Sequence, residues 1–223
     1  MEDTFQVKFY LCFVFISKMD ITFPPPPPPS GADCLNMKEY GGKLTSTNGW
    51  ERIESKGTVI PCQRSLHAGA VWRDNFIVFG GYDGHHRVND LYSFNFKSSS
   101  WNLLNNINAP SPRDRHVAVV YENSLYIFGG FDGTMRVNDL HAYDLEHNEW
   151  HRVEIIGGMS PSPRHSHAAV VYQDSMFVFG GYDGSYRSDL HEFNFSQQRW
   201  FQVCSIFLFY KYKHMFFLYA TLL

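Results

Sequence analysis

The sequence is poor in charge and in cysteine, and both shortages narrow the range of functions. Charged residues make up 18% of the 223 residues, the formal net charge is −3, and Lys and Arg are dispersed. The chain therefore carries no basic patch of the kind that binds nucleic acid. The four cysteines form no C-x-x-C pair and lie far apart, at Cys12, Cys34, Cys62 and Cys204. This spacing excludes a disulfide-dense framework and predicts a reducing, cytoplasmic location.

Long hydrophobic runs are also missing. The apolar stretch Phe9 to Ile16 follows acidic residues and has no small-residue cleavage site after it, which argues against a signal peptide. Charged residues between positions 211 and 214 divide an aromatic-rich tail into pieces shorter than the roughly 20 residues of a spanning helix. We therefore expect no membrane partner. Residues 1–23 are interpreted as a non-native apolar segment and residues 204–223 as a truncated or mis-spliced end, with a membrane anchor as the alternative.

Catalytic and metal-binding motifs are absent as well. The sequence contains no G-x-S-x-G, no H-E-x-x-H and no phosphate-binding loop. Two histidine pairs, His85-His86 and His165-x-His167, are closely spaced, but no third ligand accompanies either pair. We therefore predict that the protein is not an enzyme and that it binds neither a metal nor another cofactor.

What the sequence does contain is typical of an all-β protein with many turns. Aromatic residues make up 17%, with 20 Phe and 13 Tyr, and the segments between apolar runs are rich in Gly, Asp, Asn and Ser. Aromatic residues favour strands, and the small polar residues favour turns.

A pattern of about 50 residues occurs three times, which is the period of stacked β-blades. An R-x-x-H motif begins at Arg64, Arg113 and Arg164, and its histidines are His67, His116 and His167. Each copy continues with an apolar run, a Gly-Gly pair after a phenylalanine, and a tryptophan. The glycines are Gly80, Gly81, Gly129, Gly130, Gly180 and Gly181, and the tryptophans are Trp101, Trp150 and Trp200. The third copy is one residue shorter than the others.

Within each copy, four short β-rich segments alternate with turn residues, which predicts a four-stranded antiparallel meander. In the middle copy the expected strands are 116–121, 125–128, 139–145 and one beginning at Trp150, and the glycine pair ends the second strand. Such units bury too little apolar surface to stand alone, so they stack around an axis. Three units do not close a ring, and we expect the chain to be poorly stable as a monomer.

The order of R-x-x-H, apolar strand, Gly-Gly, aromatic residue and Trp resembles the Kelch repeat, whose proteins form β-propellers. The repeated Phe-Gly-Gly-Tyr-Asp-Gly is particularly similar to the Kelch half of leucine-zipper-like regulator proteins, without their BTB domain. The resemblance implies an all-β, Kelch-type β-propeller fragment with an incomplete ring. The repeats are expected to span 50–203, with a strand of a preceding blade at 50–54 and blades at about 61–104, 110–155 and 161–203.

Two further segments precede the repeats. Residues 24–30 contain a six-proline run, Pro24 to Pro29, which adopts the extended polyproline helix. A stiff spacer is the preferred interpretation, and a ligand for an SH3, WW or profilin-like groove is the alternative. Residues 31–49 are interpreted as a linker.

The longer loops of each meander, which follow the second strand, carry the candidate binding residues. They span 82–89, 131–138 and 182–188, and each has an arginine six positions after the second glycine. Arginine beside aromatic residues suits recognition of acidic or phosphorylated protein segments. The predicted partner-binding residues are Tyr82, His85, His86, Arg87, Phe131, Met135, Arg136, Tyr182, Tyr186 and Arg187.

Construction of the propeller is the alternative role for residues that every copy repeats. Arg87, for example, could pair with Asp83 or with an acid in a neighbouring blade. The repeated glycines, tryptophans and histidines are assigned structural roles, as are the arginines of R-x-x-H. The better candidates for specificity differ between matching loops, and these are His85, His86, Met135, Ser185 and Tyr186.

We therefore expect a protein-interaction module that acts as a substrate adaptor or a scaffold, with its oligomeric state left open. An actin-associated scaffold is the alternative function. An enzyme of Kelch fold is a third hypothesis, for which the resemblance implies a copper centre with a Tyr-Cys crosslink or an E-x-x-x-D-x-x-x-H iron motif. The sequence favours neither, because its cysteines lie mostly outside the repeats and the iron motif is absent.

Overall fold

The computed structural model describes residues 53–203, of which residues 55–203 lie in one compact unit. The predicted segments 1–23, 24–30, 31–49 and 204–223 lie outside the described residues, as do positions 50–52 of the strand expected at 50–54. Positions 53 and 54 carry no strand, and Lys56 forms an isolated parallel bridge with Ser100. The described part of the chain has no helix that is long and apolar enough to cross a membrane.

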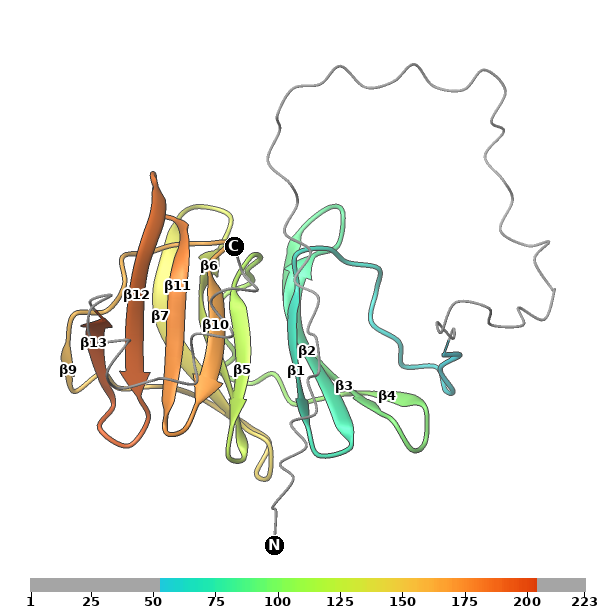
Figure 1. The fold of residues 1–223 in the computed structure, drawn as a ribbon. Coiled ribbons are helices and arrows are strands. Elements are labelled where there is room, and N and C mark those ends of the chain that lie inside the picture. The colour runs from blue at the N-terminus through green and yellow to red at the C-terminus, as the bar shows by residue number, and fades with distance from the viewer. Residues whose placement is uncertain (1–52, 204–223) are drawn as a thin grey trace, which may run out of the picture. The chain divides into compact units, whose positions relative to one another are not determined.

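Three sheets, each built on an antiparallel meander of four strands and here called blades 1, 2 and 3, follow one another along the chain (Figure 1). Blade 1 contains β1 (Ala68–Trp72), β2 (Asn75–Tyr82), β3 (Arg87–Asn95) and β4 (Ser100–Leu103). Blade 2 contains β5 (Val117–Tyr121), β6 (Ser124–Phe131), β7 (Arg136–Asp144) and β8 (Glu149–Arg152). Blade 3 contains β10 (Ala168–Tyr172), β11 (Ser175–Tyr182), β12 (Tyr186–Asn194) and β13 (Arg199–Val203). The predicted all-β class of successive meanders is confirmed, and the described sheets do not close a ring.

Blade 3 has one strand more than predicted, because the segment before it is longer. The repeated Trp and Arg on either side are 14 positions apart there (150 to 164) and 12 positions apart before blade 2 (101 to 113). The extra length lets the two-residue β9 (Gly157–Gly158) pair in parallel with β13. Gly158 has a φ of 84°, and a Cβ at this position would lie 1.8 Å from the Trp200 carbonyl oxygen. Only glycine therefore allows this close approach.

The sequence suggested that the glycine pair ends the second strand. In the structure the strand continues through the pair. β6 continues through Gly129 and Gly130 with a shift in its register against β7. Both glycines have positive φ, 65° and 104°, which permits a β-bulge that keeps the two strands paired beyond it. The expected loop 131–138 is consequently reduced to a turn at 132–135, and Arg136 begins β7.

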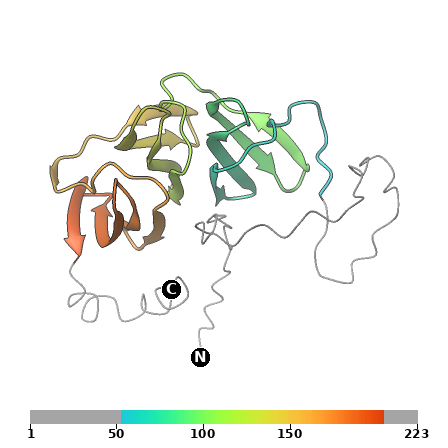
Figure 2. The same cartoon turned by 90° about the horizontal axis from the view of Figure 1, so that it is seen from above.

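The hydrophobic core lies between neighbouring blades, which Figure 2 shows from above as separate sheets. The strand β5 lies beside both β1 and β10. One buried cluster joins blade 1 to blade 2 through Ile77, Phe79, Leu91, Leu125, Ile127, Tyr143, Leu145 and Trp150. A second cluster joins blade 2 to blade 3 and includes Val117, Val119, Phe128, Leu140, Met176, Val178, Phe193, Phe195 and Trp200. Each blade therefore depends on its neighbour for burial of its apolar face.

The same contacts recur at both interfaces between blades. At the first interface, the N–H of Gly81 donates to the Arg113 carbonyl over 2.8 Å. His116 and Trp150 pack against Phe79, with ring centroids 5.4 and 5.1 Å from the phenylalanine ring. The second interface repeats these contacts at 2.9, 5.4 and 5.1 Å, with Gly130, Arg164, His167, Trp200 and Phe128.

Blade 1 has no preceding blade within residues 53–203, and the exposure of its side chains reflects this. His67 is exposed, whereas the equivalent His116 is buried. Phe96 is 45% exposed, whereas Leu145 and Phe195, at the same position of the other copies, are 7% and 8% exposed. The leading face of blade 1 therefore presents the side chains that blades 2 and 3 bury against their predecessors.

Candidate functional site

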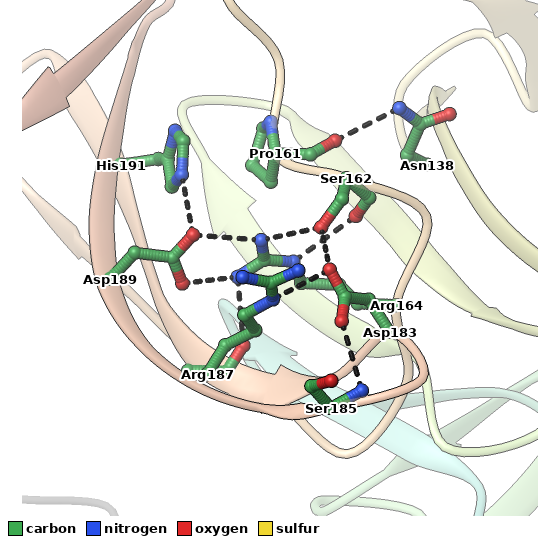
Figure 3. A network of polar contacts seen from close by, with 10 residues as sticks. Asn138, Pro161, Ser162, Arg164, Asp183, Ser185, Arg187, Asp189 and His191 are labelled. Atoms are coloured by element: carbon green, nitrogen blue, oxygen red, sulfur yellow. Dashed lines mark hydrogen bonds and ion pairs between the residues drawn. The ribbon is translucent and has the colours of Figure 1, made fainter.

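Each R-x-x-H arginine forms a clamp inside its own blade. In blade 2, the fully buried Arg113 donates to both carboxylate oxygens of Asp139, at 2.7 and 2.9 Å, and to the Gly129 carbonyl. The same clamp in blade 3, which Figure 3 shows, consists of Arg164, Asp189 and the Gly180 carbonyl, with Ser162 and His191 as further partners. In blade 1 it consists of Arg64, Asp90 and Gly80.

Electrostatics favour the ionised form of the clamp. The hydrogen bond from Arg164, supported by the one from His191, holds the pKa of Asp189 well below its usual range. The pKa of Asp139 is also low, because hydrogen bonds from His141 and Arg113 outweigh the effect of its burial. A guanidinium that is buried and already bidentate has no capacity left for a partner protein. These arginines are therefore not part of a binding surface.

The histidines of the second and third copies are buried and neutral. Burial, and after it the charge of Arg113, lowers the pKa of His116 to about 3. Burial and the charge of Arg164 have the same effect on His167. His167 Nε2 lies 3.2 Å from the Phe128 carbonyl oxygen of the preceding blade. Both rings fill the interface between blades.

The part of the chain from 53 to 203 contains no group of three His, Cys, Asp or Glu side chains that could hold a metal ion. The rings of His85 and His86 lie side by side at an exposed turn, with centroids 6.2 Å apart.

The turns between the second and third strands carry the predicted binding residues. Asp132 closes the turn of blade 2, because its Oδ1 accepts the N–H groups of Thr134 and Met135 at 2.8 Å each. Met135 and Tyr186 are exposed large hydrophobic side chains at these turns, at 59% and 70%. The other predicted residues divide into the exposed His85, His86 and Arg187 and the half-buried Tyr82, Arg87, Phe131, Arg136 and Tyr182.

The three predicted arginines are not equivalent in the structure. In blades 1 and 2 the aromatic residue after the glycine pair lies opposite Arg87 or Arg136, whereas in blade 3 it lies opposite Tyr186. The turn of blade 3 is one residue shorter, so Arg187 falls one position later, and a shift of one residue moves a side chain to the other face of a strand. Arg187 donates to Asp183 of its own turn over 2.7 Å (Figure 3).

The side chains of Arg87 and Arg136 make equivalent contacts across the two interfaces between blades. The Arg87 guanidinium lies 4.7 Å from the centroid of the Phe131 ring, and the Arg136 guanidinium lies 5.4 Å from that of Tyr182. Each arginine also reaches the turn glycine of the next blade, where a Cβ would lie 3.4 Å from Arg87 at Gly133 and 3.5 Å from Arg136 at Gly184. Both arginines thus reach from one blade onto the next.

Arg87 and Arg136 lie beside different side chains of the next blade. Arg87 Nε lies 3.0 Å from Asp114 Oδ2, in an ion pair whose geometry is not that of a hydrogen bond, and Arg115 contacts the other oxygen at 3.2 Å. At the equivalent position blade 3 has His165. Burial, followed by the charges of Arg115 and Arg136, lowers the pKa of His165. Arg136 forms no ion pair with any residue in the range 53–203.

A row of aromatic rings runs from Phe131 of blade 2 to Tyr186 of blade 3. Ring centroids are 6.3 Å apart for Phe131 and His165, 5.5 Å for His165 and Tyr182, and 5.2 Å for Tyr182 and Tyr186. We define the blade 2–3 face as Phe131, Met135, Arg136, His165, Tyr182 and Tyr186. The sequence suggests His165 only as a metal ligand, although it occupies a variable position inside the otherwise repeated R-x-x-H motif.

Comparison with known proteins agrees with the repeat pattern. Residues 42–208 match the KLHDC2/KLHL20/DRC7 Kelch-repeats domain. The leucine-zipper-like transcriptional regulator 1 homolog of Drosophila melanogaster is 33% identical over 180 residues, which are 77% of this chain and 13% of that protein. Kelch domain-containing protein 1 of Mus musculus is 37% identical over 68 residues, which are 30% of this chain and 17% of that protein.

A plant protein matches a shorter part of the chain. The N-(sulfonatooxy)prop-2-enimidothioate sulfolyase of Thlaspi arvense is 39% identical over 56 residues, which are 24% of this chain and 16% of that protein. The chain spans less than a fifth of the length of each of these three relatives.

Proposed function

Because this chain belongs to the family of Kelch-repeat domains, whose members are typically protein-interaction modules, we propose that it binds a partner protein through the blade 2–3 face. The observation that carries the proposal is the exposure of Met135 and Tyr186, at 59% and 70%, beside the continuous row of rings. Methionine and aromatic side chains are enriched where proteins bind one another, since they contribute large contact areas.

The charges of the face favour a partner segment that is acidic or phosphorylated. Arg136 forms no ion pair within the described part of the chain, and the Arg115 side chain nearby is 36% exposed. Arginine recognises carboxylates and phosphates through paired hydrogen bonds, and the neighbouring rings supply rigid contact area. We therefore propose an acidic or phosphorylated segment as the ligand class.

Binding is proposed here in preference to catalysis. The Kelch-repeat family is generally non-enzymatic, and the similarity to the sulfolyase covers only 24% of this chain. The buried arginines and histidines of the repeat are occupied with contacts inside and between blades. We propose no catalytic role and no cofactor for them.

The test uses the full chain as bait in a cell extract, with two variants beside it. The first variant carries Met135→Ser and Tyr186→Ser, and the control carries His85→Ser and His86→Ser on the exposed turn of blade 1. We expect proteins that the wild type and the control retain and that the first variant loses. Identical sets of proteins on all three baits would refute the proposed face.

The same experiment separates two finer roles. A ubiquitin-ligase subunit among the retained proteins would support a substrate adaptor. Co-sedimentation of the chain with actin filaments would support a cytoskeletal scaffold instead. Sensitivity of either interaction to the double substitution Met135→Ser and Tyr186→Ser would connect it to the blade 2–3 face.

A further inference from the structure

At the two equivalent interfaces between blades, an acid faces the arginine at the first and a histidine faces it at the second. Arg87 and Arg136 each extend from the start of a third strand, over an aromatic ring and toward a turn glycine of the next blade. The aromatic ring and the turn glycine recur at both interfaces, whereas Ser166 stands where blade 2 has Arg115 and the turn of blade 3 is one residue shorter. Within residues 53–203, the structure therefore contrasts Arg87, which has a counterion, with Arg136, which has none.

The counterion at the first interface is the carboxylate of Asp114. Its side chain is 1% exposed and lies within ion-pair distance of both Arg87 and Arg115. At the second interface this position is His165, a half-buried imidazole that stacks near Phe131 and Tyr182. An imidazole in the field of two arginines does not neutralise a guanidinium. Arg136 is left with a cation–π contact to Tyr182 and with no acid from blade 3.

We propose that an anionic group of the bound partner, an Asp or Glu carboxylate or a side-chain phosphate, occupies beside Arg136 the place that the Asp114 carboxylate occupies beside Arg87. The proposal deepens the proposed function and rests on it, since it assumes that the blade 2–3 face binds a protein segment. It assigns Arg136 as the residue that recognises the charge and His165 as the residue that leaves the place open for it.

The geometry suits an incoming anion in two ways. Arg136 is half-buried and held over Tyr182, so its guanidinium is partly desolvated and ordered before binding. Charge-assisted hydrogen bonds are stronger in such a setting than on a fully hydrated side chain. Arg115, which is 36% exposed, adds a second positive charge near the same place. The exposed Met135 and Tyr186 flank the site and would contact the rest of the segment.

Three labelled peptides that differ only in charge test the proposal on the full chain. All are short Gly/Ser peptides carrying fluorescein, and their central pair is Glu-Glu, Gln-Gln or phosphoserine-Ser. Fluorescence anisotropy should show binding of the Glu or the phosphoserine peptide at least about tenfold tighter than that of the Gln peptide. The tighter of the two distinguishes a carboxylate ligand from a phosphate ligand.

The informative variant is His165→Asp, which supplies in blade 3 the acid that blade 2 already has. We expect it to fold, with a thermal midpoint at or above that of the wild type, and to lose about tenfold in affinity for the anionic peptide. Arg136→Gln should lose affinity to a similar extent, whereas Arg187→Gln, which removes an arginine tied to Asp183, should not. The last two variants decide the question if His165→Asp fails to fold.

The reciprocal change is Asp114→Asn, which removes the counterion of Arg87. We expect this variant to bind the anionic peptides at least as tightly as the wild type. Equal affinity for charged and uncharged peptides, or undiminished binding by the Arg136→Gln variant, would overturn the proposal. A partner protein that depends on Met135 and Tyr186 but is indifferent to Arg136→Gln would leave the proposed function standing and remove this inference alone.

Discussion

Arg113 and Asp139 form a bidentate ion pair inside blade 2, with N–O distances of 2.7 and 2.9 Å, although the arginine side chain is completely buried. The same guanidinium donates to the carbonyls of Gly129 and Ser111, at 3.1 Å each. These bonds satisfy a charge whose burial would otherwise be strongly unfavourable. The pair also holds the segment before β5 against β7. This positions the Arg113 carbonyl, which accepts a hydrogen bond from the N–H of Gly81 in blade 1.

Asp139→Asn is expected to destabilise the protein substantially, because it leaves the buried Arg113 without its counterion. Removal of one partner of a buried ion pair typically costs about 3–5 kcal/mol in the free energy of unfolding. Urea denaturation followed by tryptophan fluorescence measures this loss. Glu146→Gln is the matched control, since it breaks an ion pair of the same 2.7 Å length to Arg73 with both side chains exposed. The control should lose less than about 1 kcal/mol, and equal losses in the two variants would contradict the assigned role of the clamp.

The fold could be predicted from the sequence because its strongest signals repeat. Gly129-Gly130, Trp150 and His116 each serve an interface that recurs with the next copy, so the same residue types return at the same spacing. The repeat therefore predicted the number of blades and the order of their strands. The course of β6 beyond the glycine pair could not be predicted, because Gly-Gly suits a bulge and a strand end equally well.

The candidate site was harder to predict, because its specific features are departures from the repeat. The shorter turn of blade 3 puts Tyr186 where blades 1 and 2 have arginine, and the deletion cannot be placed from the sequence alone. Likewise, the contact of Arg87 with Asp114 joins side chains on different blades. The sequence suggested an acid in a neighbouring blade as one of two partners for Arg87, and only the structure identified which acid it is.

Trp150→Ala and Trp101→Ala should have unequal effects on stability, although both residues occupy the same position of the repeat. Trp150 is 5% exposed and packs against Phe79 of the preceding blade, whereas Trp101 is half-buried and contacts rings of its own blade. Loss of a buried tryptophan costs about 3–5 kcal/mol, and loss of the partly exposed one should cost clearly less. Thermal unfolding followed by circular dichroism compares the two variants. A larger loss for Trp101→Ala would show that the packing between blades 1 and 2 is not as described.

Stability should fall as the pH is lowered from about 6.5 toward 3, because His116 and His167 are buried as neutral groups. Their pKa is about 3 in the folded protein, against an ordinary value of 6.5. In this window the unfolded chain binds protons that the folded chain does not, so protonation favours unfolding. Each histidine contributes at most about 1.4 kcal/mol per pH unit to the slope. Urea midpoints measured at several pH values between 7.5 and 5 give that slope.

His116→Gln identifies the source of this pH dependence. The variant lacks one titrating group of the interface, so the slope of its unfolding free energy against pH should be smaller than that of the wild type. His86→Gln, on the exposed turn of blade 1, is the control and should keep the full slope. An unchanged slope for His116→Gln would mean that other groups govern the acid sensitivity. The low pKa of Asp189 adds to the loss at lower pH, as the pH approaches and passes below the ordinary carboxylate value of 3.8.

Gly129→Ala and Gly180→Ala separate backbone strain from packing between blades. The two glycines have nearly the same φ, 65° and 64°, so an alanine at either position adopts the left-handed conformation at a cost of about 1–2 kcal/mol. At Gly129 the new Cβ would also lie 2.8 Å from His167 Cε1 and 3.0 Å from the Arg164 carbonyl oxygen, both on the next blade. At Gly180, among the residues that the structure describes, it would meet only the backbone of Arg187, 3.0 Å away in its own blade. We therefore expect Gly129→Ala to lose about 1–3 kcal/mol more than Gly180→Ala in urea denaturation, because overpacking at the interface adds to the strain. Equal losses would mean that His167 moves aside freely, and that the contact between blades 2 and 3 at this point is loose.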